Sequence, residues 1–552
     1  MHKRLRQLLL TTTTLGTLAL IFAFAGPGDN YFEITRNLDI FTSIYSEINT
    51  YYVDEVEPEK VINEGINEML ASLDPYTNYI PAEARTAYAT QATGQYGGIG
   101  ALVGPRNGKP TIIMPYPGYP AHDAGLKIGD AIVGVDGKTE AENESGDLST
   151  FLKGDVGTTI TLTIERPGQT NTFDVTLTRK NITINNVRYQ GMVSEDVGYI
   201  RLTDFTTEAG DEVQAALIDL KAKGAKGIIL DLRGNPGGLL SEAINVSNVF
   251  IPRGKTVLKT QGRIAEWNKS YKTLNEAMDT ELPMAVLINS GSASAAEIVA
   301  GVIQDYDRGV LLGEKSFGKG LVQSTRQLPY DAQVKITTAK YYTPSGRCIQ
   351  AIDYSLRNED GSVGKVPDSL KSAFTTEAGR TVYDGGGIDP DIEVVGEDMH
   401  LITYQLLRAG HLFNYATKYT LDHETIAAAD QFDFTDSDYQ HFLNWLQEQD
   451  LDFESPLLQE YEALAEQVEE AGWSDNLAAE MEALKQSLKP DPIEEARIHQ
   501  AQIKVFLKEE IISRYYLQQG SIQSSLTTDQ VVNEAIGVLR DQSRYKGILS
   551  PQ

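Results

Sequence analysis

The sequence contains a single cysteine, Cys348, in 552 residues. An intramolecular disulfide is therefore impossible, and no cysteine pair or Cys/His cluster supports a zinc site. We interpret the lone thiol, which follows Arg347, as a small buried residue rather than a nucleophile. The sequence thus offers no candidate zinc site, and we expect the protein to use no cofactor.

Histidine is also scarce, with seven residues, and none of them lies between residues 184 and 395. A Ser-His-Asp triad inside that segment is therefore excluded. A nucleophilic serine there would need another base, and a desolvated lysine is the known alternative. The histidines are His2, His122, His400, His411, His423, His441 and His499.

Positive charge is in deficit, with 48 Lys and Arg against 77 Asp and Glu and a formal net charge of −29. Such a chain repels nucleic acid and anionic lipid, so we expect no nucleic-acid partner. We attribute the acidity to solubility. With 41% hydrophobic residues, the chain has enough apolar side chains for several cores.

Long apolar runs are missing except near the N-terminus, where Lys3, Arg4 and Arg6 precede an apolar run over residues 8–25. A basic start, an apolar stretch and the Ala23-Phe24-Ala25 ending are typical of a secretory signal. We expect residues 1–25 to be a signal peptide or membrane anchor. The protein is then exported to the periplasm or cell envelope, with residues 8–25 able to hold it at the inner membrane.

The remaining chain predicts a multidomain α/β protein. Residues 30–90 show helical spacing of apolar residues, and residues 91–183 contain short strands with glycine turns. Strand-like and helix-like segments alternate over residues 184–395, which favours a substantially parallel sheet. Residues 396–552 are helical and acidic. These helices are predicted to pack as a domain. The alternatives are that they dock on the protease, form a homo-oligomer or bind an adaptor protein.

Three short segments in residues 184–395 carry candidate chemistry. Ser294 follows a buried strand and a small-residue loop at the expected start of a helix, where free N–H groups favour a developing oxyanion. Taken alone, this serine is better explained as a helix N-cap. Lys319 lies between two glycines before an apolar strand, and Gln323 follows it. Taken alone, this lysine is better explained as part of a solvated surface loop.

The third segment, Asp231-Leu232-Arg233-Gly234-Asn235-Pro236-Gly237-Gly238, joins a strand to a helix through a glycine turn. Such a turn presents backbone amides to an anion. It lacks the Gly-Lys-Ser/Thr ending of a phosphate loop. A tight structural turn remains the simple alternative.

Together, DLRGNPGG, SGSASAAEI and GEKSFGKGLVQ resemble the motifs of carboxyl-terminal processing (tail-specific) proteases, a Ser-Lys peptidase family, over about residues 30–395. The resemblance implies a crotonase-like ββα core in a serine endopeptidase. It implies Ser294 as nucleophile, Lys319 as general base and Gln323 as the group that orients Lys319. It also implies an oxyanion hole formed by the amides of Gly238 and Ala295.

A second resemblance precedes the core. Ala124-Gly125-Leu126-Lys127-Ile128-Gly129-Asp130, after a glycine loop, resembles a PDZ domain. Glycine amides capture a terminal carboxylate, and the strand beside them accepts an extended peptide. Where the family's motif reads Leu-Arg-Gly, this sequence has Lys153 in place of the arginine. Lysine lacks the bidentate fork of arginine. The expected peptide-binding residues are Tyr96, Gly97, Gly98, Ile99 and Gly100.

Three functions compete. The first is an active endopeptidase that recruits exported proteins by apolar C-terminal tails. The second is a non-enzymatic PDZ scaffold or chaperone with an inactive core, which the presence of Ser294, Lys319 and Gln323 disfavours. The third is an acyl-CoA enzyme of the crotonase type, which the signal segment and the PDZ-like region disfavour.

Overall fold

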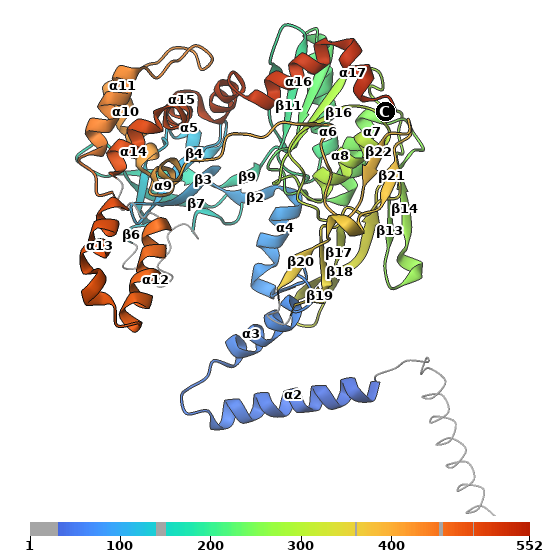
Figure 1. Cartoon of the computed structure of the whole chain (residues 1–552), viewed down its shortest axis with the longest axis horizontal. Helices are drawn as coiled ribbons and strands as arrows, with labels where there is room; N and C mark the ends of the chain where they lie inside the picture. The colour runs from blue at the N-terminus through green and yellow to red at the C-terminus, as the bar shows by residue number, and fades with distance from the viewer. Residues whose placement is uncertain (1–30, 140–150, 359–361, 452–455, 489–490, 552) are drawn as a thin grey trace, which may run out of the picture. The chain divides into compact units, whose positions relative to one another are not determined.

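The computed structural model describes residues 31–139, 151–358, 362–451, 456–488 and 491–551 (Figure 1). The predicted signal or anchor, residues 1–25, lies outside these residues. Within the described part of the chain, no helix is long and apolar enough to cross a membrane. The chain forms two units, residues 1–81 with 325–336, and residues 82–324 with 337–552.

In its described residues, from Tyr31 onward, the first unit contains two helices and a short strand pair. Its elements are α2 (Tyr31–Tyr51), α3 (Pro58–Ala71) and β1 (Asn78–Ile80). Pro58 begins α3, where its missing N–H costs no hydrogen bond. β1 pairs antiparallel with residues 333–335 of β18 (Gln333–Tyr342).

The second unit begins with η1 (Ala82–Ala84), α4 (Arg85–Thr93) and an antiparallel β region. Its sheet has the strand order β3-β4-β5-β7-β8, with β6 paired to β5, and a separate pair joins β2 to β9. β3 therefore forms one edge of this sheet. The strands are β2 (Gln95–Gly98), β3 (Ala101–Arg106), β4 (Lys109–Pro115), β5 (Ala131–Val135), β6 (Lys138–Thr139), β7 (Thr159–Glu165), β8 (Phe173–Thr178) and β9 (Lys180–Thr183), with one helix, α5 (Pro120–Asp123).

A sheet of six strands, in the order β10-β11-β12-β15-β16-β23, forms the centre of the next region. β10 and β11 are antiparallel, and the other neighbours are parallel. These strands are β10 (Val187–Met192), β11 (Val197–Leu202), β12 (Gly227–Asp231), β15 (Met284–Ile288), β16 (Val310–Gly313) and β23 (Ile392–Glu393).

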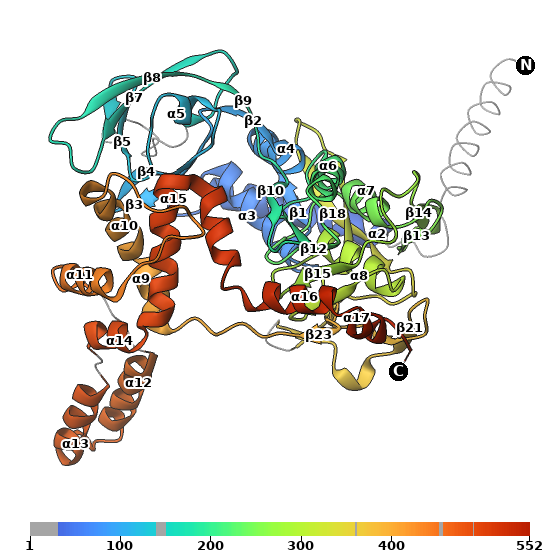
Figure 2. The same cartoon turned by 90° about the horizontal axis from the view of Figure 1, so that it is seen from above.

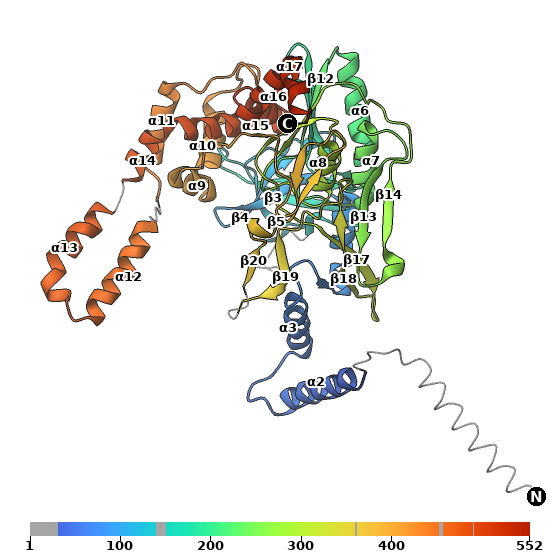
Figure 3. The same ribbon diagram turned by 45° about the vertical axis from the view of Figure 1, so that its right-hand side comes forward.

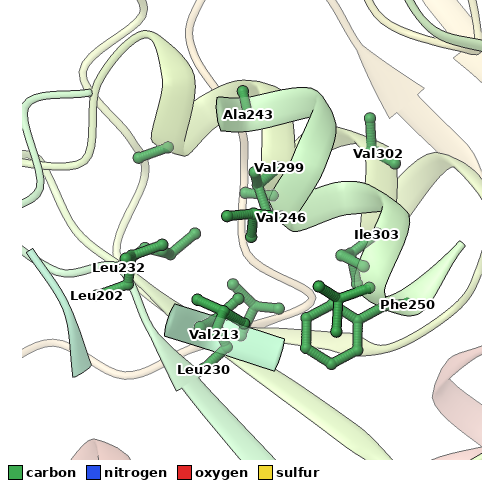
Figure 4. Close-up of a cluster of buried hydrophobic side chains, with 14 of the residues drawn as sticks. Leu202, Val213, Leu230, Leu232, Ala243, Val246, Phe250, Val299, Val302 and Ile303 are labelled. Atoms are coloured by element: carbon green, nitrogen blue, oxygen red, sulfur yellow. The ribbon is translucent and has the colours of Figure 1, made fainter. Parts of the chain in front are cut away.

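Helices cover both faces of this sheet (Figure 2). Its central strands are therefore buried on both sides, which explains why their sequences are continuous apolar runs. Ile228 and Leu230 of β12 pack against α6 (Ala209–Ala222), α7 (Leu240–Phe250) and α8 (Ala295–Asp305), in the core drawn in Figure 4. Ile229 points to the other face, which α16 (Gln530–Arg540) and α17 (Gln542–Ile548) cover.

Smaller strands flank this core. β13 pairs with both β14 and β18, β17 pairs with β18, and two more pairs are β19 with β20 and β21 with β22. Their bounds are β13 (Thr256–Gln261), β14 (Lys269–Lys272), β17 (Leu321–Gln327), β19 (Ile352–Arg357), β20 (Val363–Lys365), β21 (Ala373–Thr375) and β22 (Thr381–Tyr383), with short helices η4 (Ala265–Trp267) and η5 (Asp368–Leu370).

The C-terminal region is helical, as the sequence predicts. An aromatic-rich core joins the helices within residues 401–446 and 492–526, and α12 and α13 form a helical hairpin (Figure 3). The helices are α9 (Leu401–Arg408), α10 (His411–Asp422), α11 (Asp436–Leu446), α12 (Pro456–Glu470), α13 (Ser474–Ser487), α14 (Pro492–Ile498) and α15 (Gln500–Leu526). The expected multidomain α/β fold, with a preceding β domain and helical flanking regions, is confirmed.

Candidate active site

Ser294 lies at the N-terminus of α8, directly after the loop that leaves β15. Its backbone has φ 54° and ψ −111°, which a residue with a side chain rarely adopts. Its N–H donates to Glu297 Oε2 at 2.8 Å, and the Tyr341 hydroxyl lies 3.4 Å from its carbonyl oxygen. Strain of this kind persists where the surrounding structure enforces it, and it is common at functional sites.

The glycine turn after β12 contacts this serine. Gly237 has φ 96°, and a Cβ placed on it would lie 2.9 Å from Ser294 Cβ and 2.8 Å from the nitrogen of Ala295. The N–H of Ala293 donates to the carbonyl of Asn235 at 2.9 Å. Only glycine at position 237 allows the turn and the serine loop to approach this closely.

Backbone pairing orients the next residue of the turn, Gly238. Phe205 N–H donates to Gly237 O at 3.2 Å, and Leu239 N–H donates to Phe205 O at 2.7 Å. In such a parallel bridge the N–H of Gly238 itself faces away from Phe205. Among the hydrogen bonds of the described residues, none uses the N–H of Gly238 or that of Ala295. These two amides, which the sequence predicts as the oxyanion hole, thus have no acceptor among the described residues.

Glu297 is a site residue that the sequence analysis did not assign. It is fully buried and accepts hydrogen bonds from Ser316 Oγ and Gly318 N, both at 2.6 Å, and from Lys319 N at 2.9 Å. With the bond from Ser294, one carboxylate therefore joins the serine loop to the lysine loop. Burial raises the pKa of Glu297, and the donated hydrogen bonds oppose that rise.

The sequence signal for this group was present in the Ser-x-x-Glu spacing of a capping box. In the structure the glutamate caps the serine's N–H, and its other contacts come from a loop about 20 residues further along the chain. Sequence spacing reveals the local bond only.

Lys319 is half-buried in the loop between β16 and β17. A Cβ on Gly318 would lie 2.4 Å from Ala351 Cβ, and one on Gly320 would lie 2.8 Å from Gln350 N. The Gly320 N–H donates to Gln350 Oε1 at 2.7 Å. Both glycines are therefore required by close packing, which fixes the backbone on either side of Lys319.

The same loop is tied to the serine loop directly, because Phe317 N–H donates to Ser292 O at 3.0 Å. Gln323 is half-buried in β17, and its Nε2 donates to Thr337 Oγ1 at 3.2 Å. The predicted role of Gln323 in orienting Lys319 stays a prediction.

Of the residues expected to bind peptide, Tyr96, Gly97 and Gly98 belong to strand β2, and Ile99 and Gly100 connect β2 to β3. Tyr96 and Gly98 pair with strand β9, and Ile99 is buried in the core of the β domain. Gly100 has φ 74°, and a Cβ on it would lie 2.3 Å from Tyr119 Cβ. Lys153, which replaces the family's arginine, has its Nζ 5.4 Å from the centroid of the Tyr96 ring.

Comparisons with known proteins cover most of this architecture. The model of peptidase family S41 matches residues 196–356, a PDZ domain model matches residues 97–177, and "Probable PDZ-protease, C-terminal helical domain" matches residues 402–539. A carboxy-terminal-processing protease of Bartonella bacilliformis is 39% identical over 321 residues, which cover 57% of this chain and 73% of that protein.

The carboxy-terminal processing protease CtpA of Bacillus subtilis is 32% identical over 385 residues, covering 69% of this chain and 79% of that protein. Among solved structures, a photosystem II D1 C-terminal processing protease is 26% identical, with a TM-score of 0.35, and the match covers 64% of this chain and 92% of that one.

A peptidase core of this family preceded by a PDZ domain defines a serine-type endopeptidase. The chain belongs to the carboxyl-terminal processing proteases, as the resemblance of its motifs predicted.

Proposed function

We propose that this protease cleaves by a dyad of Ser294 and Lys319. The observation that carries the proposal is the position of Glu297, whose carboxylate accepts the N–H groups of both residues at 2.8 and 2.9 Å. The two backbones are thereby held at one buried group. No histidine lies in residues 184–395 to act as an alternative base.

In this mechanism, neutral Lys319 accepts the proton of the Ser294 hydroxyl as Ser294 Oγ attacks the scissile carbonyl carbon. The N–H groups of Gly238 and Ala295 donate to the resulting oxyanion. Lys319 then gives its proton to the leaving amine. Water, deprotonated by Lys319, hydrolyses the acyl-enzyme, and Gln323 orients the lysine amine through its side-chain oxygen.

We also propose that the PDZ domain recruits substrates by apolar C-terminal tails. β3 forms an edge of its sheet, so an extended peptide can add to it as a further strand. The loop over residues 96–100 precedes that edge and is expected to hold the terminal carboxylate. The substrates are exported proteins, because the basic and apolar sequence of residues 1–25 is typical of export to the periplasm or cell envelope.

A cleavage assay on residues 26–552 tests this function. The substrate is an unfolded protein with an apolar C-terminus, compared with the same protein carrying a C-terminal amide. Ser294→Ala and Lys319→Met are expected to abolish cleavage, and amidation to slow it. Ser290→Ala and Lys315→Ala, exposed residues of the same two loops, are matched controls expected to cleave normally.

Cleavage that survives Lys319→Met would contradict the dyad. Equal cleavage of the free and amidated substrates would contradict carboxylate capture. Fractionation of cells that express the full chain, with the N-terminus of the recovered protein sequenced, tests export; recovery in the cytoplasm would contradict it.

A further inference from the structure

We propose that Asp529, in the C-terminal helical domain, is a positioning residue for the catalytic turn over residues 231–238 and acts through Arg233. The inference rests on the proposed function, since it assigns Gly238 of this turn to the oxyanion hole. It gives the C-terminal domain a part in catalysis that its sequence did not predict.

Asp529 forms a two-pronged ion pair with Arg233, 296 positions earlier in the chain. The two arginine NH groups donate to Asp529 Oδ1 at 3.2 Å and to Asp529 Oδ2 at 2.7 Å. Only about a fifth of each side chain is exposed. Paired, charge-assisted hydrogen bonds of this kind fix orientation as well as distance.

Arg233 is held from a second side by Asp231, the last residue of β12. The Arg233 guanidinium donates to Asp231 Oδ2 at 2.6 Å, and the Tyr199 hydroxyl donates to the same oxygen at 2.5 Å. Burial alone would raise the pKa of Asp231, but the charge of Arg233 holds it below its ordinary value. One guanidinium thus joins the end of the strand to the C-terminal domain.

The turn passes from Arg233 to Gly238 with little freedom. Asn235 N–H donates to Leu232 O at 3.1 Å, and Asn235 Oδ1 accepts the N–H of Gly237 at 2.8 Å. A shift of Arg233 is therefore transmitted to the amides that follow. Because Gly237 packs against Ser294 at van der Waals limits, a small displacement changes the direction of the Gly238 N–H.

Asp529 is also the N-cap of α16, and its Oδ1 accepts the N–H of Val531 at 2.9 Å and of Val532 at 3.0 Å. Asparagine caps helices as well as aspartate. Asp529→Asn therefore keeps the cap and removes the charge that pairs with Arg233. The apolar face of α16 remains buried on the sheet in that variant.

Asp541 supplies a matched control. It caps α17 in the same way, accepting the N–H groups of Ser543 and Arg544, both at 3.0 Å. Among the described residues it forms no ion pair. Asp196→Asn is a second control, because Asp196 joins α16 to the core through Arg540 at 2.8 Å, away from the catalytic turn.

The experiment compares wild type, Asp529→Asn, Asp529→Glu, Asp541→Asn and Asp196→Asn in kcat and KM for one peptide substrate. It also measures the affinity of the matching peptide aldehyde, whose adduct with Ser294 places an oxyanion at the two amides. Asp529→Asn is expected to lower kcat and aldehyde affinity about ten- to a hundredfold with KM unchanged, since displacements near 1 Å have effects of that size. Asp529→Glu recovers part of the loss, and the controls match wild type.

Hydrogen exchange of the peptide covering residues 231–239 is the readout that does not need turnover. Faster exchange there in Asp529→Asn, but not in Asp541→Asn, supports the proposal, whether or not the wild type cleaves. An inactive wild type would instead contradict the proposed Ser294–Lys319 dyad. Unchanged exchange, wild-type kcat in Asp529→Asn, or an equal loss in the two controls overturns it.

Discussion

Residues of the serine and glycine loops store strain and tolerate few substitutions. The φ of 54° at Ser294 costs of order 1–3 kcal/mol in a residue with a side chain. Contacts with Gly237 and the carboxylate of Glu297 hold the serine in that conformation. Changes at these two neighbours are therefore expected to affect catalysis.

Gly237→Ala is expected to reduce kcat about a hundredfold or more. The added methyl meets Ser294 Cβ at 2.9 Å and the nitrogen of Ala295 at 2.8 Å, so it displaces the nucleophile and one oxyanion donor. Steady-state kinetics measures the effect. Gly224→Ala, a glycine of similar φ with open space around it, serves as the control, and equal losses in both variants would contradict this explanation.

Glu297→Gln is expected to destabilise the protein by about 1–3 kcal/mol and to lower kcat. The amide nitrogen of glutamine cannot accept the hydrogen bonds that one carboxylate oxygen now receives, which leaves buried donors unpaired. Urea unfolding and kcat are measured together, with exposed Glu266→Gln as control. Wild-type stability and kcat in Glu297→Gln would contradict the role of this carboxylate in holding the serine loop and the lysine loop together.

At the scale of elements, the sequence predicts which helices cover one face of the central sheet but not which helices cover the other. Apolar runs such as 227–231 and 284–288 predict strands buried on both faces, and α6 to α8 follow as crossover helices. The other face is covered by α16 and α17 from the far end of the chain. No local pattern reports such a long-range contact.

Leu539→Ala tests the contribution of that second layer. Leu539 is 4% exposed and packs with Ile229 and Ala285 under α16, so its truncation is expected to cost about 2–5 kcal/mol. Ile218 of α6 is 46% exposed. Ile218→Ala should therefore change stability by less than about 0.5 kcal/mol. Thermal unfolding checks both, and a Leu539→Ala protein as stable as wild type would mean that α16 is not part of the folded core.

The same limit explains which site residues the sequence predicts. Ser294, Lys319 and Gly238 lie in short motifs whose chemistry is local. Glu297 and Asp529 bind partners in distant segments, and the sequence analysis assigned neither of them a role. The spacing of residues does not reveal that Glu297 would bind the lysine loop or that Asp529 would bind Arg233.

At the scale of the whole molecule, the second unit brings three regions to one cavity of about 390 Å³. Arg106 of the PDZ domain, Arg188 and Arg201 of the core, and Glu509 and Glu510 of α15 line it. Burial, and then the charge of Glu510, raise the pKa of Glu509 to about 7. A carboxylate at this junction therefore titrates near neutral pH.

Stability is expected to fall as pH rises through about 7 because of Glu509. Its pKa is higher in the folded than in the unfolded protein, so the favourable contribution is complete below the ordinary value of 4.5 and is lost as pH passes the folded value. Glu509→Gln should flatten the unfolding temperature between pH 5 and about 8, and exposed Glu480→Gln should not. A wild-type pH profile in Glu509→Gln would contradict the assignment.

The most direct test of the account is to trap the acyl-enzyme. Wild type and Lys319→Met are mixed with an activated peptide ester, quenched in acid and analysed by mass spectrometry after digestion. The account predicts an acyl group on the peptide that contains Ser294 in wild type and none in Lys319→Met. Acylation at another residue, or at Ser294 at the wild-type rate without Lys319, would contradict the Ser294–Lys319 dyad.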